Sequence, residues 1–473
     1  MLLALPATLF TIFVIVTLFR LDRSDERKPS IATWIPFVWL FIESSRPVSA
    51  WIHLNVPGNV TNEYIDGSPL DRNILTVLLA IGLLFLSRRM KRVGAILGSN
   101  PAILLYFFFC LVSLIWSDYP FVVFKRWIRS VGDVVMLFIL ITEQDRLSAF
   151  KRILTRVGYF VIPLSILLIR FYPALGRFYS RGGSPEWTGV GTDKNALGMI
   201  CMIYGIVFLW RWLDLYAVKK KSLKQRQTLT ALGLAMTMVI YLLIIADSQT
   251  ALSCFGMASV LIVATAWSKY WRKSAPLTMM VAGMVGFAYC VLIAGIGSWL
   301  LTLLGRNPSL TGRTAVWDTL LDHAVNPWIG AGYENFWIGE RVELFNRILG
   351  GLNQAHNGYI EIYLNMGFAG LAFLAGVIVT GYRNILWELR HDVMAARLKA
   401  AFFVICLIYN FTEASFKMMS PVWFTFLWAV MMVPNSRKAR VAVPDQSRRM
   451  ERDPIAEASW ETVPSAPASR LSS

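Results

Sequence analysis

The histidine at position 356 has the residue type and setting of a general base. It stands in a turn at the mouth of an apolar segment, with Asn357 next and Glu361 one turn later. A neutral imidazole in such a place can take a proton from a hydroxyl group at neutral pH. A helix cap or an interfacial position is the alternative explanation of the same residue. His323 is a weaker candidate, and His391 lies in a basic loop that offers no catalytic setting.

Two long segments between apolar runs, 172–194 and 299–357, carry cations beside glycines. An arginine presents a planar fork of donors that fits phosphate oxygens two at a time. Glycine lets backbone N–H groups approach the same anion closely. The two segments therefore suggest a clamp for a pyrophosphate group, with solvated or salt-bridged surface cations as the alternative. The cations are Arg177, Arg181, Lys194, Arg306, Arg313, Arg341 and Arg347.

The composition indicates which elements position these residues. The chain has 473 residues, of which 56% are hydrophobic and only 16% charged, and its mean hydropathy is +0.53. A soluble domain averages about 25% charged residues, so the chain is expected to be a polytopic membrane protein. The five cysteines all lie in apolar stretches without CxxC spacing, which indicates neither a zinc site nor a disulfide framework.

Apolar segments long enough to be considered spans recur along the whole chain. They predict an all-α membrane protein with about 12–13 transmembrane helices. The first segment runs into Arg20 without a basic leader and is expected to be an uncleaved span. The segments are 2–19, 31–52, 73–87, 100–116, 122–142, 153–171, 195–212, 229–246, 250–267, 277–298, 358–381, 399–416 and 421–433.

The formal net charge of +17 is explained as a topology signal rather than as nucleic-acid binding. Lys and Arg concentrate in alternate loops, which marks those loops as cytoplasmic. The two long segments then lie on the opposite, outer side of the membrane. The tail from residue 434 lacks a hydrophobic period and is expected to be a disordered cytoplasmic extension near anionic lipid. The expected divisions are 1–171, 172–194, 195–298, 299–357, 358–433 and 434–473.

Several motifs resemble one known family. The string LTGRTAVW…NPWIGAGYENFW…AHNGYIEIYLNMGFAGL is similar to the signature region of bacterial O-antigen ligases and Wzy-type polysaccharide polymerases. The closest likeness is to the exopolysaccharide-production branch. SRPVSAW, LIWSDYPFVVFKR and GVGTDKNALG resemble that branch as well. As an ordered set on one side of the membrane, these motifs are specific.

The resemblance implies a GT-C-like membrane glycosyltransferase whose donor is a saccharide on undecaprenyl pyrophosphate. It also implies a location in the bacterial inner membrane, with the reaction on the periplasmic face. Carried over by motif, the phosphate-binding arginines fall on Arg181 and Arg313, and the catalytic histidine falls on His356. Possible further contacts to substrate are Arg177, Lys194, Asn195, Trp317 and Asn357.

The chemistry so implied needs no metal and no cofactor. The pyrophosphate is already attached to the sugar, so two arginines would stabilise the developing charge, and one base would activate the acceptor for inversion. The chain has no Asp-x-Asp triplet and no GxxxxGK[ST] phosphate loop. The expected activity is polymerisation of lipid-linked repeat units into exopolysaccharide, with a chain-length regulator and a flippase as possible partners.

Two other functions compete with this one. A ligase that passes a finished glycan to lipid A-core or protein would share the donor site and differ in the acceptor. A transporter or flippase of lipid-linked sugars would explain the spans, and it predicts paired charges at mid-membrane. Candidates such as Arg129 with Asp133 lie near a span end, where snorkelling or amphipathic positions explain them.

Overall fold

The computed structural model describes residues 3–22, 30–52, 68–179, 185–293, 311–349 and 352–434, with the backbone alone at 311–314. Met1–Val433 form one compact unit, and Pro434–Ser473 form a second unit. Almost all of the predicted cytoplasmic tail, 434–473, lies outside the described residues. Residues 294–310, which include the start of the second long segment at 299, lie outside them as well.

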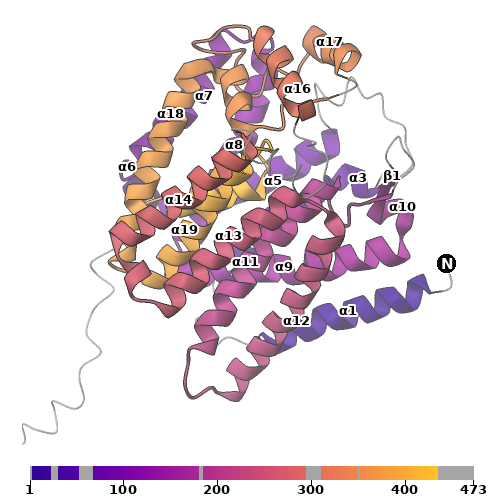
Figure 1. Ribbon diagram of the computed structural model, residues 1–473, viewed down its shortest axis with the longest axis vertical. Coiled ribbons are helices and arrows are strands. Elements are labelled where there is room, and N and C mark those ends of the chain that lie inside the picture. Colours follow the sequence, from indigo (N-terminus) through magenta and orange to yellow (C-terminus); the bar gives the residue numbers. More distant parts are fainter. Residues whose placement is uncertain are drawn as a thin grey trace, which may run out of the picture. The chain divides into compact units, whose positions relative to one another are not determined.

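Figure 1 shows a helical protein in which one short hairpin supplies the strands of the described residues. The first half contains α1 (Ala4–Leu21), η1 (Ile31–Thr33), α2 (Trp34–Glu43), α3 (Val48–Ile52), α5 (Pro69–Ser87), α6 (Met90–Gly98), α7 (Pro101–Val112), η2 (Ser113–Ile115), α8 (Pro120–Ile141), α9 (Arg146–Phe171) and α10 (Pro173–Gly176). The hairpin pairs β1 (Arg177–Tyr179) with β2 (Pro185–Trp187) in antiparallel register. The second half contains α11 (Lys194–Tyr216), α12 (Leu223–Ala246), α13 (Gln249–Trp267), η3 (Tyr270–Arg272), α14 (Ser274–Leu292), α16 (Thr311–Asp322), α17 (Glu340–Ile348), α18 (Gly358–Leu389), α19 (Val393–Tyr409) and α20 (Pro421–Val430).

The all-α polytopic fold class is confirmed. Among the described residues, eight helices are long and apolar enough to cross a membrane, α1 among them, and a bent pair raises the number to nine. In that pair, Met90–Gly98 and Pro101–Ile115 meet at 93°.

The other four expected spans are also helical, but each falls short for a visible reason. The helices α2 and α20 have 10 residues each, about 15 Å, against an apolar layer of about 30 Å. The helix α19 has 17 residues, about 26 Å, and is also shorter than that layer. The 22-residue helix α8 is long enough, but it carries Lys125, Arg126, Arg129 and Asp133.

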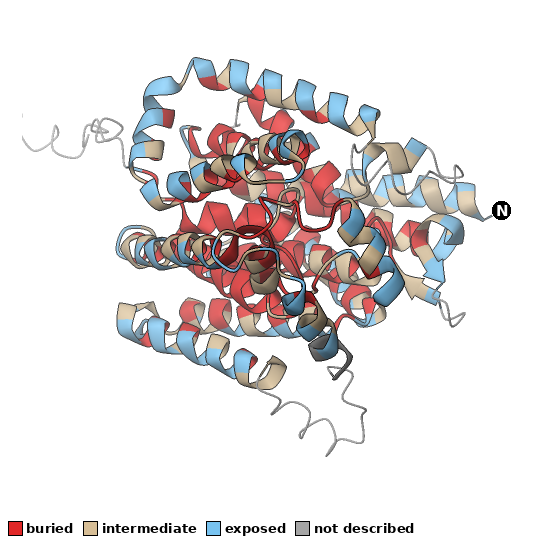
Figure 2. Ribbon diagram, turned by 90° about the horizontal axis from the view of Figure 1, so that it is seen from above, coloured by how far each residue is buried: buried red, intermediate tan, exposed pale blue. Residues whose placement is uncertain are grey.

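Burial separates a packed interior from an apolar periphery. Figure 2 shows buried residues in the middle of the helical unit and exposed ones on the outward faces. The exposed faces are themselves apolar, as at Leu5, Leu9 and Phe13 on α1 and Leu83 and Leu84 on α5. Outward apolar faces of this kind are expected where lipid, rather than water, surrounds a helix.

The helix α18 is broken, and the break receives the NPWIGAG segment. Gly367 has a φ of +63° inside the helix. The backbone N–H of Phe368 donates to Pro327 at 2.8 Å, and that of Gly332 donates to Asn365 at 2.8 Å. A Cβ atom on Gly330 would come within 2.3 Å of the Asn365 backbone. Glycine is therefore required there, because no side chain fits between the two backbones.

The second long segment has a small core of its own. Leu320, Phe336, Trp337, Phe345 and Leu364 belong to one buried cluster that is separate from the main core. The rings of Phe336 and Phe345 stack at 5.6 Å. Because this cluster includes Leu364 of α18, it fixes the described part of the segment against the start of that helix.

Candidate functional site

His356 is held in place by its neighbours on both sides. Its own φ of +48° is left-handed, which is unusual for a non-glycine residue. The side chain of Asn357 caps α18 by accepting the N–H groups of Tyr359 at 3.0 Å and Ile360 at 3.1 Å. On the other side, the Trp317 indole donates to the Ala355 carbonyl at 2.8 Å. Trp317 and Asn357 therefore position the turn that presents the imidazole.

The imidazole faces a carboxylate from a different part of the chain. His356 Nδ1 lies 3.3 Å from Glu413 Oε2, and the Asn195 amide donates to Glu413 Oε1 at 3.0 Å. The Glu413 side chain is 8% exposed, whereas that of His356 is 26% exposed. The three side chains come from the start of α11, the turn before α18 and the α19–α20 connection. We refer to His356, Glu413 and Asn195 as the histidine cluster.

The histidine cluster adjoins a cavity of about 560 Å³, whose lining includes Asn195 and Glu413. The cations that line it are Lys125, Arg126, Arg129 and Lys417. The acids that line it are Glu43, Asp193, Glu334 and Glu413. Neither carboxyl oxygen of the buried Glu43 has a hydrogen-bond partner within the described ranges. The cavity thus offers both signs of charge, with three of its four cations on the first turns of α8.

Two of these cations also hold the loops around the cavity. Arg126 donates to the backbone oxygen of Glu334, and Lys417 donates to the Gln354 side chain at 3.3 Å. Burial raises the pKa of the Glu334 carboxyl above its ordinary value, while Lys417 and Arg126 oppose that rise. The loops at 334 and 354 are therefore each held by a cation that lines the cavity.

Glu361 anchors the turn. Its carboxylate accepts the Trp337 indole N–H at 2.9 Å and the backbone N–H of Ala355. These bonds connect the first turn of α18 with both the aromatic core of the second segment and the residue before His356.

The sequence-predicted phosphate ligands are described only in part. Arg181 lies outside the described residues, and Arg313 is placed on α16 by its backbone alone. Arg177 donates to the Ile169 carbonyl at 2.9 Å and lies over the Trp187 ring at 4.7 Å. Lys194 forms an ion pair with Glu186 at 3.4 Å. Of the predicted substrate contacts, the structure brings Asn195 into direct contact with the partner of His356.

The competing histidine, His323, directly follows α16 and has a different setting. It is exposed, its Nδ1 is 2.8 Å from the Thr319 carbonyl, and its ring contacts Phe345 edge-on at 5.6 Å. No group of three or more His, Cys, Asp or Glu residues that could hold a metal ion occurs in the described ranges.

Sequence reasoning missed Glu413, Lys125 and Arg126, and it explained Arg129 as a snorkelling or amphipathic residue near a span end. Glu413 stands in a short connection between two apolar runs, where a lone acid has no pattern around it. The α8 cations could have been recognised as unusual, because they lie at the end of an expected span that is opposite to the basic loops. Arg46, within the SRPVSAW motif, was missed as well. It donates to Gly191 at 2.9 Å and Gly189 at 3.0 Å, and so holds the loop that leads into Asn195.

We expect Glu413→Gln to lower the transfer rate by at least about 10- to 100-fold, the range known for losing a partner that orients a metal-bound histidine. The amide keeps the shape but no longer favours the Nδ1-protonated tautomer. Glu343→Gln on the exposed helix α17 is the matched control. An unchanged transfer rate for Glu413→Gln would remove the positioning role.

Comparisons with known proteins show what the chain is similar to. Residues 234–375 match a family model described as O-antigen ligase, and they include α16, α17 and the His356 turn. The exopolysaccharide production protein ExoQ of Rhizobium meliloti (strain 1021) is 27% identical over 308 residues, which is 61% of this chain and 66% of that protein. The match thus spans slightly under two thirds of the relative's own length. The resemblance seen in the motifs is confirmed, and the role of each residue remains a prediction.

Proposed function

We propose that this chain, a member of the superfamily of O-antigen ligases and Wzy-type polymerases, is an inner-membrane polysaccharide polymerase. It joins oligosaccharide repeat units carried on undecaprenyl pyrophosphate, and it does so on the periplasmic face. The observation that carries the proposal is the histidine cluster beside a cavity lined by four cations and four acids, with three of the cations grouped on the first turns of α8. A base next to positive charge is what glycosyl transfer from a pyrophosphate donor requires.

His356 acts as the base in this mechanism. With its Nδ1–H donating to Glu413, its Nε2 is left with the lone pair that accepts the acceptor's hydroxyl proton. The hydroxyl oxygen forms a bond to the anomeric carbon as the bond from that carbon to the pyrophosphate oxygen breaks. The electron pair leaves with the pyrophosphate, and attack from the opposite face inverts the anomeric centre. Glu413 stabilises the imidazolium, and Asn195 holds Glu413 in orientation.

The leaving pyrophosphate accumulates negative charge, so the transition state is stabilised by fixed cations nearby. Arg181 and Arg313 are proposed as the bidentate ligands. Lys125, Arg129 and Lys417, which line the cavity, would supply further positive potential around them. The charge on these residues makes a divalent ion unnecessary, and we expect added chelator to leave the transfer rate unchanged.

A ligase is the second candidate, and the description of the matching family model favours it. The two reactions share donor and base but differ in acceptor. Purified protein in liposomes, given only the lipid-linked repeat unit, should produce a ladder of longer lipid-linked glycans. A single transfer that needs added lipid A-core, with no ladder in its absence, would replace the polymerase by the ligase.

The orientation of the chain is tested with reporters. A reporter fused after Lys221 should report cytoplasm, and one inserted near Glu340 should report periplasm, because Lys and Arg mark the cytoplasmic loops. Alkaline phosphatase and green fluorescent protein fusions measure the two sides independently. Both reporters on one side of the membrane would overturn the periplasmic location of the site.

A further inference from the structure

A second cavity lies at the opposite end of α8 from the candidate site. Its volume is about 850 Å³. It is lined by residues 87–92, which run from the end of α5 into the first turn of α6, by residues 142–145 between α8 and α9, and by Ser30. The helix α5, which is long and apolar enough to cross a membrane, ends at Ser87 in this lining. Its 19 residues span about 29 Å at 1.5 Å per residue. This length matches an apolar layer of about 30 Å, so the second cavity lies near the opposite membrane surface.

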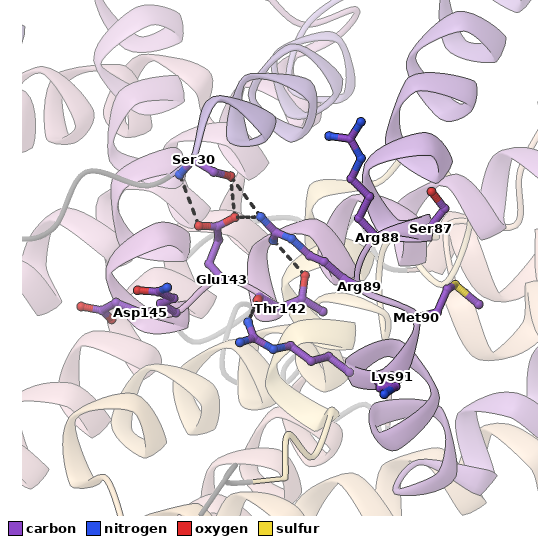
Figure 3. A pocket seen from close by; sticks show the side chains of 11 residues that line it. Ser30, Ser87, Arg88, Arg89, Met90, Lys91, Thr142, Glu143 and Asp145 are labelled. Carbon is purple, nitrogen blue, oxygen red and sulfur yellow. Dashed lines mark hydrogen bonds and ion pairs between the residues drawn. The ribbon is translucent and has the colours of Figure 1, made fainter. Parts of the chain in front are cut away.

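One side of this cavity is a closed network. Glu143 accepts the Ser30 hydroxyl at 2.6 Å and pairs with Arg89 at 2.7 Å. Burial opposes ionisation of Glu143, but the hydrogen bonds from Ser30 and Arg89 outweigh it and lower the pKa of the carboxyl. Arg89 also donates to the Thr142 hydroxyl, and Arg92 donates to the Thr142 carbonyl. Figure 3 shows Arg89 directed into this network.

The other side carries positive charge that the network does not use. Arg88 and Lys91 line the cavity and are exposed, and no hydrogen bond or ion pair to another described residue is found for either. In Figure 3, Arg88 points away from Glu143. The lining has four cations and two acids, and one of those acids, Asp145, caps α9 through the backbone N–H of Ser148. The cavity therefore keeps a net positive charge.

We propose that this second cavity is a binding site for the phosphate headgroup of an anionic phospholipid, with Arg88 and Lys91 as its ligands. The guanidinium fork of Arg88 fits two phosphate oxygens, and the Lys91 ammonium adds a point charge. Leu83, Leu84 and Met90 are exposed apolar side chains next to these cations. They supply a surface for acyl chains, which a soluble phosphate compound would not need. The site is separate from the transfer reaction.

The test is the affinity of the purified full-length protein for phosphatidylglycerol, measured by native mass spectrometry or by a fluorescent lipid in detergent. Each cation near a membrane surface contributes about 1 kcal/mol to binding anionic lipid, so Arg88→Gln with Lys91→Gln should weaken binding about 10- to 30-fold. Lys219→Gln with Lys220→Gln removes the same charge from the exposed α11–α12 connection and should change it less than about twofold. The swap Arg88→Lys with Lys91→Arg keeps the charge and should keep most of the affinity.

Three outcomes would overturn the proposal. Equal losses from the two glutamine pairs would reduce the effect to general electrostatics. Unchanged binding in the Arg88 and Lys91 pair, with the protein monodisperse, would show that the lipid binds elsewhere. Displacement of the lipid by millimolar inorganic phosphate would assign the cavity to a soluble phosphate ligand.

Discussion

Replacement of His356 by alanine is expected to lower the rate of glycosyl transfer at saturating donor by about 10²- to 10⁴-fold, the usual contribution of a general base. Donor binding should be largely kept, because the proposed pyrophosphate ligands are other residues. The measurement is a single-turnover assay with purified protein, together with donor binding to the same preparation. This combination separates loss of the base from loss of the fold.

His323→Ala is the matched control, since it removes a second histidine from the same segment. His323 is exposed just after α16 and contacts Thr319 and Phe345 rather than Glu413. The transfer rate of the His323→Ala variant should stay within about twofold of the wild-type rate, because surface substitutions usually have small effects. Transfer at the wild-type rate by His356→Ala would show that the imidazole is a helix-terminal or interfacial residue and not the base.

Arg313→Ala is expected to lower kcat by about 10²- to 10³-fold, comparable to the removal of one donor from an oxyanion-stabilising site. Arg313→Lys keeps the charge but loses the bidentate fork, so its activity should lie between alanine and wild type. Cells carrying either variant should accumulate unpolymerised lipid-linked units while the protein stays in the membrane at its normal level. Thin-layer analysis of extracted lipids measures that accumulation.

The same substitution at Arg181 tests the other proposed ligand, with Arg177→Ala as its control. Arg177 is occupied by the Ile169 carbonyl and the Trp187 ring, so we expect its loss to affect the hairpin more than the donor. Normal polymer yield from Arg313→Ala and from Arg181→Ala would mean that the cations of the cavity, rather than these arginines, bind the pyrophosphate.

The sequence alone was sufficient for the helices and for the turn that carries His356. Apolar runs locate the helices because a spanning segment needs length and hydropathy together. The turn was recognisable because a histidine followed by an Asn-Gly pair stands directly before the apolar run 358–381. The sequence did not reveal the role of Glu413, because its contacts are distant along the chain. Glu413 lies 57 positions from His356 and 218 positions from Asn195. Pairings of this kind depend on how helices pack.

Two other features were hidden by averaging along the chain. The segment 122–142 was expected to be one more span, but Lys125, Arg126 and Arg129 at the start of α8 line the cavity of the candidate site. Hydropathy over a window does not distinguish the faces or the ends of a helix. The segment 358–381 was expected to be a plain span, yet α18 breaks at Gly367. A single glycine in an apolar run gives no indication that another segment fills the break.

The central claim is that the chain forms a glycosidic bond at the expense of a lipid pyrophosphate. The most direct measurement is the ratio of undecaprenyl pyrophosphate released to glycosidic bonds formed, with purified protein in liposomes and a defined lipid-linked donor. We expect one lipid pyrophosphate for each new bond, in the presence of chelator as well as in its absence. Movement of the donor across the bilayer with neither bond formation nor release would contradict the account and indicate a transporter.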